Sequence, residues 1–212
     1  MITVVLADDH AVVAEGLGAL LREKFSLLKT VHDGRALVSA VTELNPDVVV
    51  TDISMPLLNG LDAIRQIKSA RPGANIIVLT MHAEPDLAVQ AFRAGASGYL
   101  LKVSLGEELV EAVRQVAQGR SYLTSLIAKD LISVLLEAQK DSAATAGKLT
   151  GRQREVLQLI GEGRTMKEVA TLLNISPRTA ESHKYEIMNV LGAQNTAELV
   201  QHAVRMKLVS VE

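Results

Sequence analysis

Short apolar runs alternate with amphipathic stretches over the first 120 residues of the chain. The run Val48-Val49-Val50-Thr51 is β-branched and lies between Pro46 and Asn59-Gly60, which indicates a strand buried on both faces of a parallel sheet. The predicted strands are 2–7, 28–32, 47–51, 75–80 and 97–101, and the predicted helices lie near 11–24, 35–44, 60–70, 85–94 and 105–118. A capping box at Ser104 and Glu107 is expected to open the last of these helices. The alternation predicts an α/β fold with a doubly wound, five-stranded parallel sheet.

The last third of the chain shows only helical periodicity. Thr150-x-x-Gln153 and Thr165-x-x-Glu168 are predicted capping boxes, and Ser176-Pro177 offers an N-cap and a first-turn proline. The predicted helices run from about 150 to 161, 165 to 173, 176 to 191 and 196 to 207, with Gly192 as the stop of the third. A tight turn joins the second and third helices, which predicts helix-turn-helix geometry in a small all-α, four-helix domain.

Residues 121–147 connect these two parts. Residues 124–139 form a further helical pattern with Leu126, Ile127, Leu131, Val134 and Leu135 on its apolar side. Small and polar residues follow at 140–147 and indicate a flexible tether. We therefore expect domains at 1–120 and 148–212, joined at 121–147 by a linker helix and a tether. The pattern leaves open whether this helix belongs to the linker or packs on the first domain.

Composition limits the classes of function. The 212 residues include no Cys and no Trp, which excludes disulfides, thiolate metal sites and a thiol nucleophile and disfavours aromatic stacking on single strands. No segment approaches the roughly 20 apolar residues of a membrane span, and the N-terminus lacks a basic region before its apolar run, so we expect a soluble, cytoplasmic protein without a membrane partner. Residues 148–212 carry nine basic and seven acidic residues, a balance of +2, against −4 for the remainder, which permits a polyanion-binding second domain.

Polar side chains follow successive strands of the predicted sheet. Asp8 and Asp9 come after the first strand, Asp52 after the third, Thr80 ends the fourth and Lys102 follows the fifth. Parallel strands place their carboxyl ends at one edge of the sheet, where α/β folds bind ligands. Carboxylates gathered there repel one another unless a cation shares the site, and oxygen ligands favour Mg²⁺.

A carboxylate beside Mg²⁺, an ammonium and a hydroxyl can act as a nucleophile toward a phosphoryl group. Each residue also has a simpler explanation: Asp8 or Asp9 as a helix cap, Asp52 as a turn former, Thr80 as a strand-end residue and Lys102 as a surface charge. Their occurrence together at successive strand ends favours the functional interpretation.

Residues 1–118 resemble a response-regulator receiver domain, which has a flavodoxin-like fold. The motifs are Asp8-Asp9, Thr51-Asp52-x-x-Met55-Pro56-x-x-Asn59-Gly60, Thr80 and Tyr99-Leu100-Leu101-Lys102. The resemblance implies that Asp52 accepts a phosphoryl group from a sensor histidine kinase or a small phosphodonor. It implies that Asp8 or Asp9, Asp52 and the Ser54 backbone carbonyl hold Mg²⁺, that Lys102 pairs with the acyl phosphate, and that Thr80 and Tyr99 form a switch pair. Val103 follows Lys102 where many receivers have proline in a cis peptide, so this loop is expected to differ locally.

Residues 149–205 resemble a LuxR-type output domain. The motif is Leu149-Thr-x-Arg-x-Arg-Glu155-Val-Leu-x-Leu-Ile, then Lys167-Glu168-Val-Ala, Leu173-x-Ile175-Ser176, Thr179-Ala-x-x-His183 and Ile187-x-x-x-Leu191-Gly192. The resemblance implies that the helix from 177 to 191 enters the DNA major groove. It assigns base contacts to Glu181, Ser182 and Tyr185 and phosphate contacts to Lys167, Thr179, His183 and Lys184, with Arg178 also on the outward side. Glu181 stands where some members have Lys, which would shift sequence preference, and His183 is equally explained as a half-buried structural residue.

Together the two resemblances identify the chain as a member of the NarL/FixJ family of two-component response regulators. They imply a phosphorylation-activated regulator, not an enzyme, that binds double-stranded promoter DNA as a homodimer. The fourth helix of the second domain would supply the dimer contact, with Ala197, Val200, Val204 and Leu208 as candidates. Two alternatives stay open: a phosphorylation-independent DNA binder whose receiver only dimerises, and a phosphorelay protein with a protein-binding tail.

Overall fold

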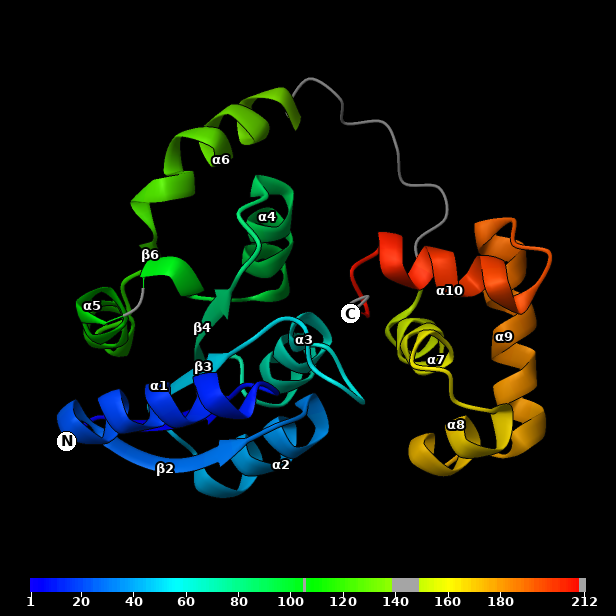
Figure 1. The fold of residues 1–212 in the computed structure, drawn as a ribbon, viewed down its shortest axis with the longest axis horizontal. Helices are drawn as coiled ribbons and strands as arrows, with labels where there is room; N and C mark the ends of the chain where they lie inside the picture. The colour runs from blue at the N-terminus through cyan, green and yellow to red at the C-terminus, as the bar shows by residue number, and fades with distance from the viewer. Residues whose placement is uncertain (105, 139–148, 210–212) are drawn as a thin grey trace. The chain divides into compact units, whose positions relative to one another are not determined.

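The computed structural model describes residues 1–104, 106–138 and 149–209 (Figure 1). The chain divides into two compact units, of which the first carries the sheet and the second is helical, and each is described by itself. The predicted tether at 140–147, Leu105 and the first residue of the predicted second domain, Lys148, lie outside the described residues.

A parallel sheet forms the centre of the first unit. Its strands are β1 (Thr3–Ala7), β2 (Ser26–Val31), β3 (Val48–Thr51), β4 (Asn75–Thr80), β5 (Gly98–Leu101) and β6 (Tyr122–Leu123), in the order β2-β1-β3-β4-β5-β6. Every pair of neighbouring strands is parallel. The predicted doubly wound α/β fold is therefore confirmed.

The predicted count of five strands is wrong, because β6 extends the sheet beyond β5. The backbone N–H groups of Tyr122 and Thr124 donate to the Ser97 and Tyr99 carbonyl oxygens, both at 3.0 Å. A two-residue strand is too short to show an alternating pattern, so the sequence carried no periodic signal for it.

Helices cover both faces of the sheet (Figure 1). They are α1 (Ala11–Lys24), α2 (Gly34–Leu44), α3 (Gly60–Ala70), α4 (Pro85–Ala94) and α5 (Glu107–Ala117), with a 3₁₀ turn η1 (Lys102–Ser104) before α5. Leu17 of α1 and Val113 of α5 pack in one cluster with Val4, Leu6 and other strand residues. Helix α2 packs against α3, and α3 against α4. The central strands β1, β3, β4 and β5 are thus buried on both sides, as their continuous apolar runs predicted, whereas Leu28 and Lys29 of the edge strand β2 are exposed.

Two local predictions are wrong. The second strand begins at Ser26 rather than at residue 28, because the chain pairs with β1 directly after α1 ends. The capping box of Ser104 and Glu107 does not form: Ser104 lies in η1, and α5 begins at Glu107 with Gly106 as its N-cap and no side-chain cap. No peptide bond among the described residues is cis, so the one between Lys102 and Val103 is trans.

The helix after β6, α6 (Ser125–Ala138), packs against α4 of the same unit. Ile127 is 2% exposed and Leu131 is 6% exposed, as predicted for the apolar side. The same prediction is wrong for Leu126, which is 61% exposed and faces solvent together with Ile132. This packing answers the question that the sequence left open: the helix lies on the first unit. The side chains of Val134 and Leu135, also predicted on the apolar side, lie outside the described residues.

The second unit consists of α7 (Gly151–Gly161), α8 (Met166–Leu173), α9 (Pro177–Leu191) and α10 (Thr196–Arg205). Both predicted capping boxes, at Thr150 and Thr165, are present, and the Ser176 side chain accepts a hydrogen bond from the Thr179 amide. Gly192 ends α9 with φ +68°, a conformation that favours glycine. The predicted four-helix domain is confirmed, with its last helix ending at Arg205 rather than at 207.

Gly60, which opens α3, contacts the backbone of the loop after β3. A Cβ atom there would overlap the Asp52 carbonyl oxygen and lie 2.9 Å from Ile53 Cα. Gly60→Ala should lower the free energy of unfolding by about 1–3 kcal/mol, because backbone atoms must shift to make room. Gly16→Ala on α1 is the matched control, since nothing lies within 4 Å of its added Cβ.

The control should raise stability by about 0.5–1 kcal/mol, because alanine is the better helix former. Urea unfolding of both variants measures the two effects. Equal stability of the Gly60 variant and the wild type would contradict the close approach.

Candidate functional site

The structure brings the polar residues at the strand ends together. Lys102 Nζ lies 2.6 Å from Asp52 Oδ2 and 2.7 Å from Asp8 Oδ2. All three side chains are buried: Asp8 is 1% exposed, Asp52 5% and Lys102 9%. Thr80, at the end of β4, is fully buried. The sheet topology explains the cluster, because β1, β3, β4 and β5 are parallel neighbours.

Backbone hydrogen bonds hold the two central carboxylates in place. The Asp8 amide donates to Val31 O on β2 at 3.1 Å, and the Asp52 amide donates to Ala7 O on β1 at 2.9 Å. Asp52 Oδ1 accepts from the Ile53 amide at 2.5 Å and from the Ser54 amide at 3.4 Å. The Asp52 carboxylate is therefore oriented by its own loop on one side and by Lys102 on the other.

The charges in this pocket do not balance. Burial raises the pKa of Asp52, although the Lys102 ammonium opposes that shift. Burial alone would lower the pKa of Lys102, and the Asp52 and Asp8 carboxylates more than reverse this effect, so the Lys102 pKa is raised. The Lys102 ammonium pairs with Asp8 and Asp52 and not with Asp9, so the three carboxylates of this group exceed the charge of the one ammonium by two. A divalent cation would balance this excess, so the residues present fit the expected Mg²⁺.

The group of potential metal ligands contains one residue that sequence reasoning missed. Ligand atoms of Asp8, Asp9, His10 and Asp52 all lie within 4.8 Å of one another. His10 directly follows the two aspartates in the sequence, a proximity that could have indicated it. The Ser54 backbone carbonyl as a ligand stays a prediction.

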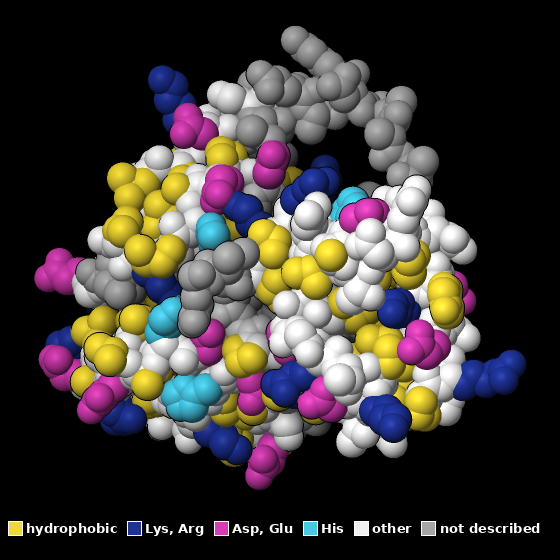
Figure 2. All heavy atoms as spheres, turned by 45° about the vertical axis from the view of Figure 1, so that its right-hand side comes forward, with side chains coloured by type: hydrophobic (Ala, Val, Ile, Leu, Met, Phe, Trp, Pro, Cys, Tyr) yellow, Lys and Arg dark blue, Asp and Glu magenta, His cyan; other side chains and the backbone are white. Residues whose placement is uncertain are grey.

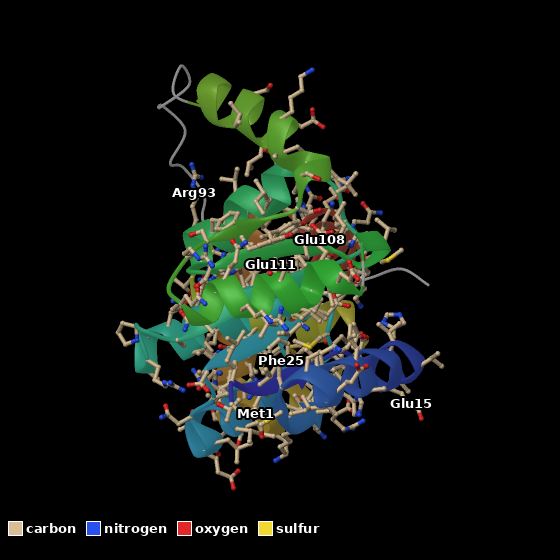
Figure 3. All side chains as sticks on the ribbon, turned by 90° about the vertical axis from the view of Figure 1, so that its left-hand side faces the viewer. Met1, Glu15, Phe25, Arg93, Glu108 and Glu111 are labelled. Atoms are coloured by element: carbon tan, nitrogen blue, oxygen red, sulfur yellow. The ribbon has the colours of Figure 1, made fainter. Side chains whose placement is uncertain are left out.

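The acidic pocket differs from the acidic side chains on the neighbouring helices. Figure 3 shows Glu15 extending away from α1, and Glu108 and Glu111 on α5. None of these belongs to a group that could hold a metal ion within the part of the chain that the structure describes. These glutamates lie apart from one another on helix surfaces, whereas Asp8, Asp9 and Asp52 lie close together at the edge of the sheet.

Thr80 and Tyr99 are connected through His82. The His82 amide donates to Thr80 Oγ1 at 3.2 Å, and the Tyr99 hydroxyl donates to the His82 carbonyl oxygen at 2.8 Å. Tyr99 is fully buried, and burial raises its pKa, so its hydroxyl remains a donor. The Tyr99 side chain therefore points into the unit, and its role in a switch pair with Thr80 stays a prediction.

Helix α9 presents most of the predicted DNA contacts to solvent. Arg178, Thr179, Ser182 and Tyr185 are exposed, Tyr185 at 63%. Glu181 and Lys184 are half-buried, and Lys167 is exposed at the start of α8. Basic side chains are scattered among acidic ones on the second unit (Figure 2). These positions suit a helix that docks in a groove, and the roles of the individual residues stay predictions.

Two predicted residues of the second unit are less available than expected. The His183 side chain is 24% exposed, and its Nδ1 lies 3.5 Å from Glu186 Oε2, which favours the structural interpretation over the phosphate contact. Leu208, a candidate for the dimer contact, is 7% exposed and packs in the core of its own unit. Val200 and Val204 are half-buried, and Ala197 is exposed.

An acidic pocket with a buried lysine at the edge of a doubly wound sheet, followed by a helix-turn-helix unit, defines a response regulator. Comparison with family models agrees: residues 4–114 match the response regulator receiver domain, and residues 147–203 match the bacterial regulatory proteins of the luxR family. The chain belongs to the NarL/FixJ family of two-component response regulators.

Relatives of the chain match over almost its full length. The oxygen regulatory protein NreC of Staphylococcus epidermidis is 35% identical, with 97% of this chain and 98% of that protein covered. NreC of Staphylococcus aureus has the same identity and coverage. The chain is therefore a response regulator with a receiver and a LuxR-type DNA-binding domain.

Solved structures show the same architecture. A structure of an RcsB–DNA complex matches with a TM-score of 0.59 at 28% identity, covering 96% of this chain and 98% of that one. RcsB of Salmonella enterica serovar Typhimurium, bound to a promoter in the presence of the phosphomimetic BeF₃⁻, matches with a TM-score of 0.60 at 27% identity, covering 99% of both chains. Within the described residues, no helix is both long enough and apolar enough to cross a membrane.

Mg²⁺ should stabilise the protein through the acidic pocket. At about 100 times its Kd, a ligand that binds only the folded state adds about 2.7 kcal/mol, which thermal unfolding would report as a higher Tm. Asp52→Asn should raise the Tm in the absence of Mg²⁺, because it removes one buried negative charge, and should remove most of the Mg²⁺ effect.

Asp130→Asn, at an exposed position of α6, serves as the control and should keep the full response to Mg²⁺. An Asp52→Asn protein that responds to Mg²⁺ as strongly as the wild type would place the ion elsewhere.

Proposed function

We propose that this protein is a phosphorylation-activated transcription regulator: Asp52 accepts a phosphoryl group from a sensor histidine kinase, and the modified protein binds promoter DNA as a dimer. The observation that carries the proposal is the Lys102 ammonium shared by the buried Asp52 and Asp8 carboxylates at 2.6 and 2.7 Å. The Asp52 carboxylate is thus fixed in position and partly desolvated, and it lies next to a positive charge that can stabilise the negative charge of a phosphoryl group during transfer.

The transfer itself requires little of the protein beyond positioning. An Asp52 oxygen attacks phosphorus, the P–N bond of a phosphohistidine breaks, and the leaving imidazole keeps the electron pair and takes up a proton. Lys102 pairs with the resulting acyl phosphate. When bound, Mg²⁺ would supply further positive charge beside the transferring group, held by Asp52 and by Asp8 or Asp9. Sensor histidine kinase and Mg²⁺ are thus the implied partner and cofactor.

The new phosphoryl oxygens would accept a hydrogen bond from the Thr80 hydroxyl, whose oxygen now accepts from the His82 amide, and would so draw Thr80 toward the pocket. Because Tyr99 donates to the His82 carbonyl, movement of Thr80 changes the surroundings of Tyr99 as well. Tyr99 lies on β5, and its backbone carbonyl oxygen accepts a hydrogen bond from the amide of Thr124, directly before α6. Phosphorylation would therefore shift the balance between two arrangements of the residues that lead from the pocket to α6, the helix that packs on α4.

DNA recognition is assigned to α9 in the major groove. Exposed Ser182 and Tyr185 would reach base edges together with Glu181, and Lys167, Thr179 and Lys184 would contact phosphates. The scattered basic residues and the balance of only +2 in residues 148–212 support weak binding by one copy. A dimer doubles the contacts and reads two half-sites, and RcsB was solved as two dimers bound to two DNAs.

Duplex binding with and without acetyl phosphate tests the switch. In the presence of Mg²⁺ the phosphodonor should tighten sequence-selective binding by at least about tenfold, the lower range of allosteric coupling energies. Asp52→Ala should bind as the untreated protein does in both conditions. Equal, tight binding by both proteins without phosphodonor would favour the phosphorylation-independent DNA binder. Absence of duplex binding across a broad sequence pool would favour the phosphorelay protein.

A pair of variants separates phosphate contacts from base contacts. Lys167→Gln should weaken binding to all duplexes alike and reduce the slope of log K against log salt by about 1. Glu181→Gln should change which base is preferred at one position of each half-site, because a carboxylate accepts from cytosine whereas an amide pairs with adenine. Binding-site selection at two salt concentrations measures both effects, and an unchanged base preference for Glu181→Gln would remove that residue from base recognition.

A further inference from the structure

His10 directs a ring nitrogen at the acidic pocket. Its Nδ1 lies 2.9 Å from Asp9 Oδ1 and 3.6 Å from Asp8 Oδ1. The His10 amide also donates to Asp8 Oδ1 at 3.0 Å, so backbone and ring both face the same carboxylate edge. His10 is the N-cap residue of α1, yet its side chain makes no capping hydrogen bond. Helix capping therefore does not account for the orientation of the His10 ring.

The two edges of the Asp8 carboxylate have different neighbours. Oδ2 pairs with Lys102, which also holds Asp52 Oδ2. Oδ1 lies near the His10 ring, whose Nδ1 also lies near Asp9 Oδ1. A cation bound on the Oδ1 side would thus meet two carboxylates and an imidazole nitrogen, whereas the Oδ2 side already has its positive charge.

The other histidines near the pocket have their Nδ1 atoms engaged elsewhere. His32 Nδ1 lies 2.8 Å from the Asp8 carbonyl oxygen, and His82 Nδ1 lies 3.5 Å from Glu84 Oε2. Of the described histidines, only His10 joins the aspartates in the group of potential metal ligands. A nitrogen ligand in this pocket would therefore come from His10.

We infer that His10 completes a mixed carboxylate–imidazole site, so that the pocket binds a transition-metal dication such as Mn²⁺ in preference to Mg²⁺. Mg²⁺ is a hard ion that takes oxygen ligands, whereas imidazole adds affinity for the first-row transition metals. The inference rests on the proposed metal pocket of Asp8, Asp9 and Asp52. The competing explanation is a simple ion pair of a protonated ring with the two aspartates, in keeping with a His10 side chain that is 66% exposed.

Electron spin echo spectroscopy of the full chain loaded with Mn²⁺ alone tests the inference. The wild type should show ¹⁴N modulation from a coordinated imidazole, and His10→Gln should lose it while still binding Mn²⁺. Competition between the two ions should show a preference for Mn²⁺ that falls by about tenfold or more in His10→Gln, since the loss of even a supporting metal-site residue costs that much. His202→Gln, in the second unit, is the matched control and should keep both the modulation and the preference.

The outcomes are distinct. Mn²⁺ bound by the wild type without ¹⁴N modulation overturns the inference and leaves the oxygen-only pocket in place. Modulation that persists in His10→Gln also overturns it, because another nitrogen is then the ligand. No binding of Mn²⁺ or Mg²⁺ by the wild type overturns the inference and the proposed metal pocket together. Loss of modulation in His10→Gln alone, with an unchanged circular dichroism spectrum, supports it.

Discussion

The buried contact of Lys102 with two carboxylates is the interaction on which the functional part of this structure depends. Asp8 and Asp52 are each no more than 5% exposed, and like charges so placed repel strongly unless a cation lies between them. The ammonium at 2.6 and 2.7 Å supplies that cation. Because its single charge leaves the pocket negative, the site favours additional positive charge and remains responsive to whatever binds there.

A pocket of unbalanced charge is well suited to a switch. Each change in its charge acts on groups whose positions are fixed by backbone hydrogen bonds, such as the Asp52 amide to Ala7 O. The backbone of both carboxylates is thus anchored to neighbouring strands, and the side chains at the border of the pocket are the next groups to meet such a change. Thr80, His82 and Tyr99 form that border through two hydrogen bonds, and β6 continues it to α6. Hydrogen bonds thus connect the charged site to the edge of the sheet that leads into α6.

The sequence could predict the strands from their apolar runs, and the pocket from the polar residues that follow those runs. The β-branched run 48–51 indicated a buried strand, and parallel strands bring Asp8, Asp52, Thr80 and Lys102 to one edge of the sheet. The Ser104 capping box failed because a 3₁₀ turn took up the residues that would have started the helix. Strand β6 was missed because a strand of two residues is too short to show an alternating pattern, and because its pairing depends on where the edge of β5 lies in space.

Sequence by itself determined the elements whose cause is local: the strands, the capped starts of α7, α8 and α9, and the order of acidic and basic groups along the sheet edge. Only the tertiary structure decided the features that depend on contacts between distant segments. The packing of α6 on α4, the bond from Tyr99 to His82 and the burial of Leu208 are of this kind. His10 is intermediate: its place directly after Asp8 and Asp9 could have indicated it, but only the backbone conformation shows that its ring turns toward the two carboxylates. Local propensity fixes which element forms, and packing fixes which side chains meet.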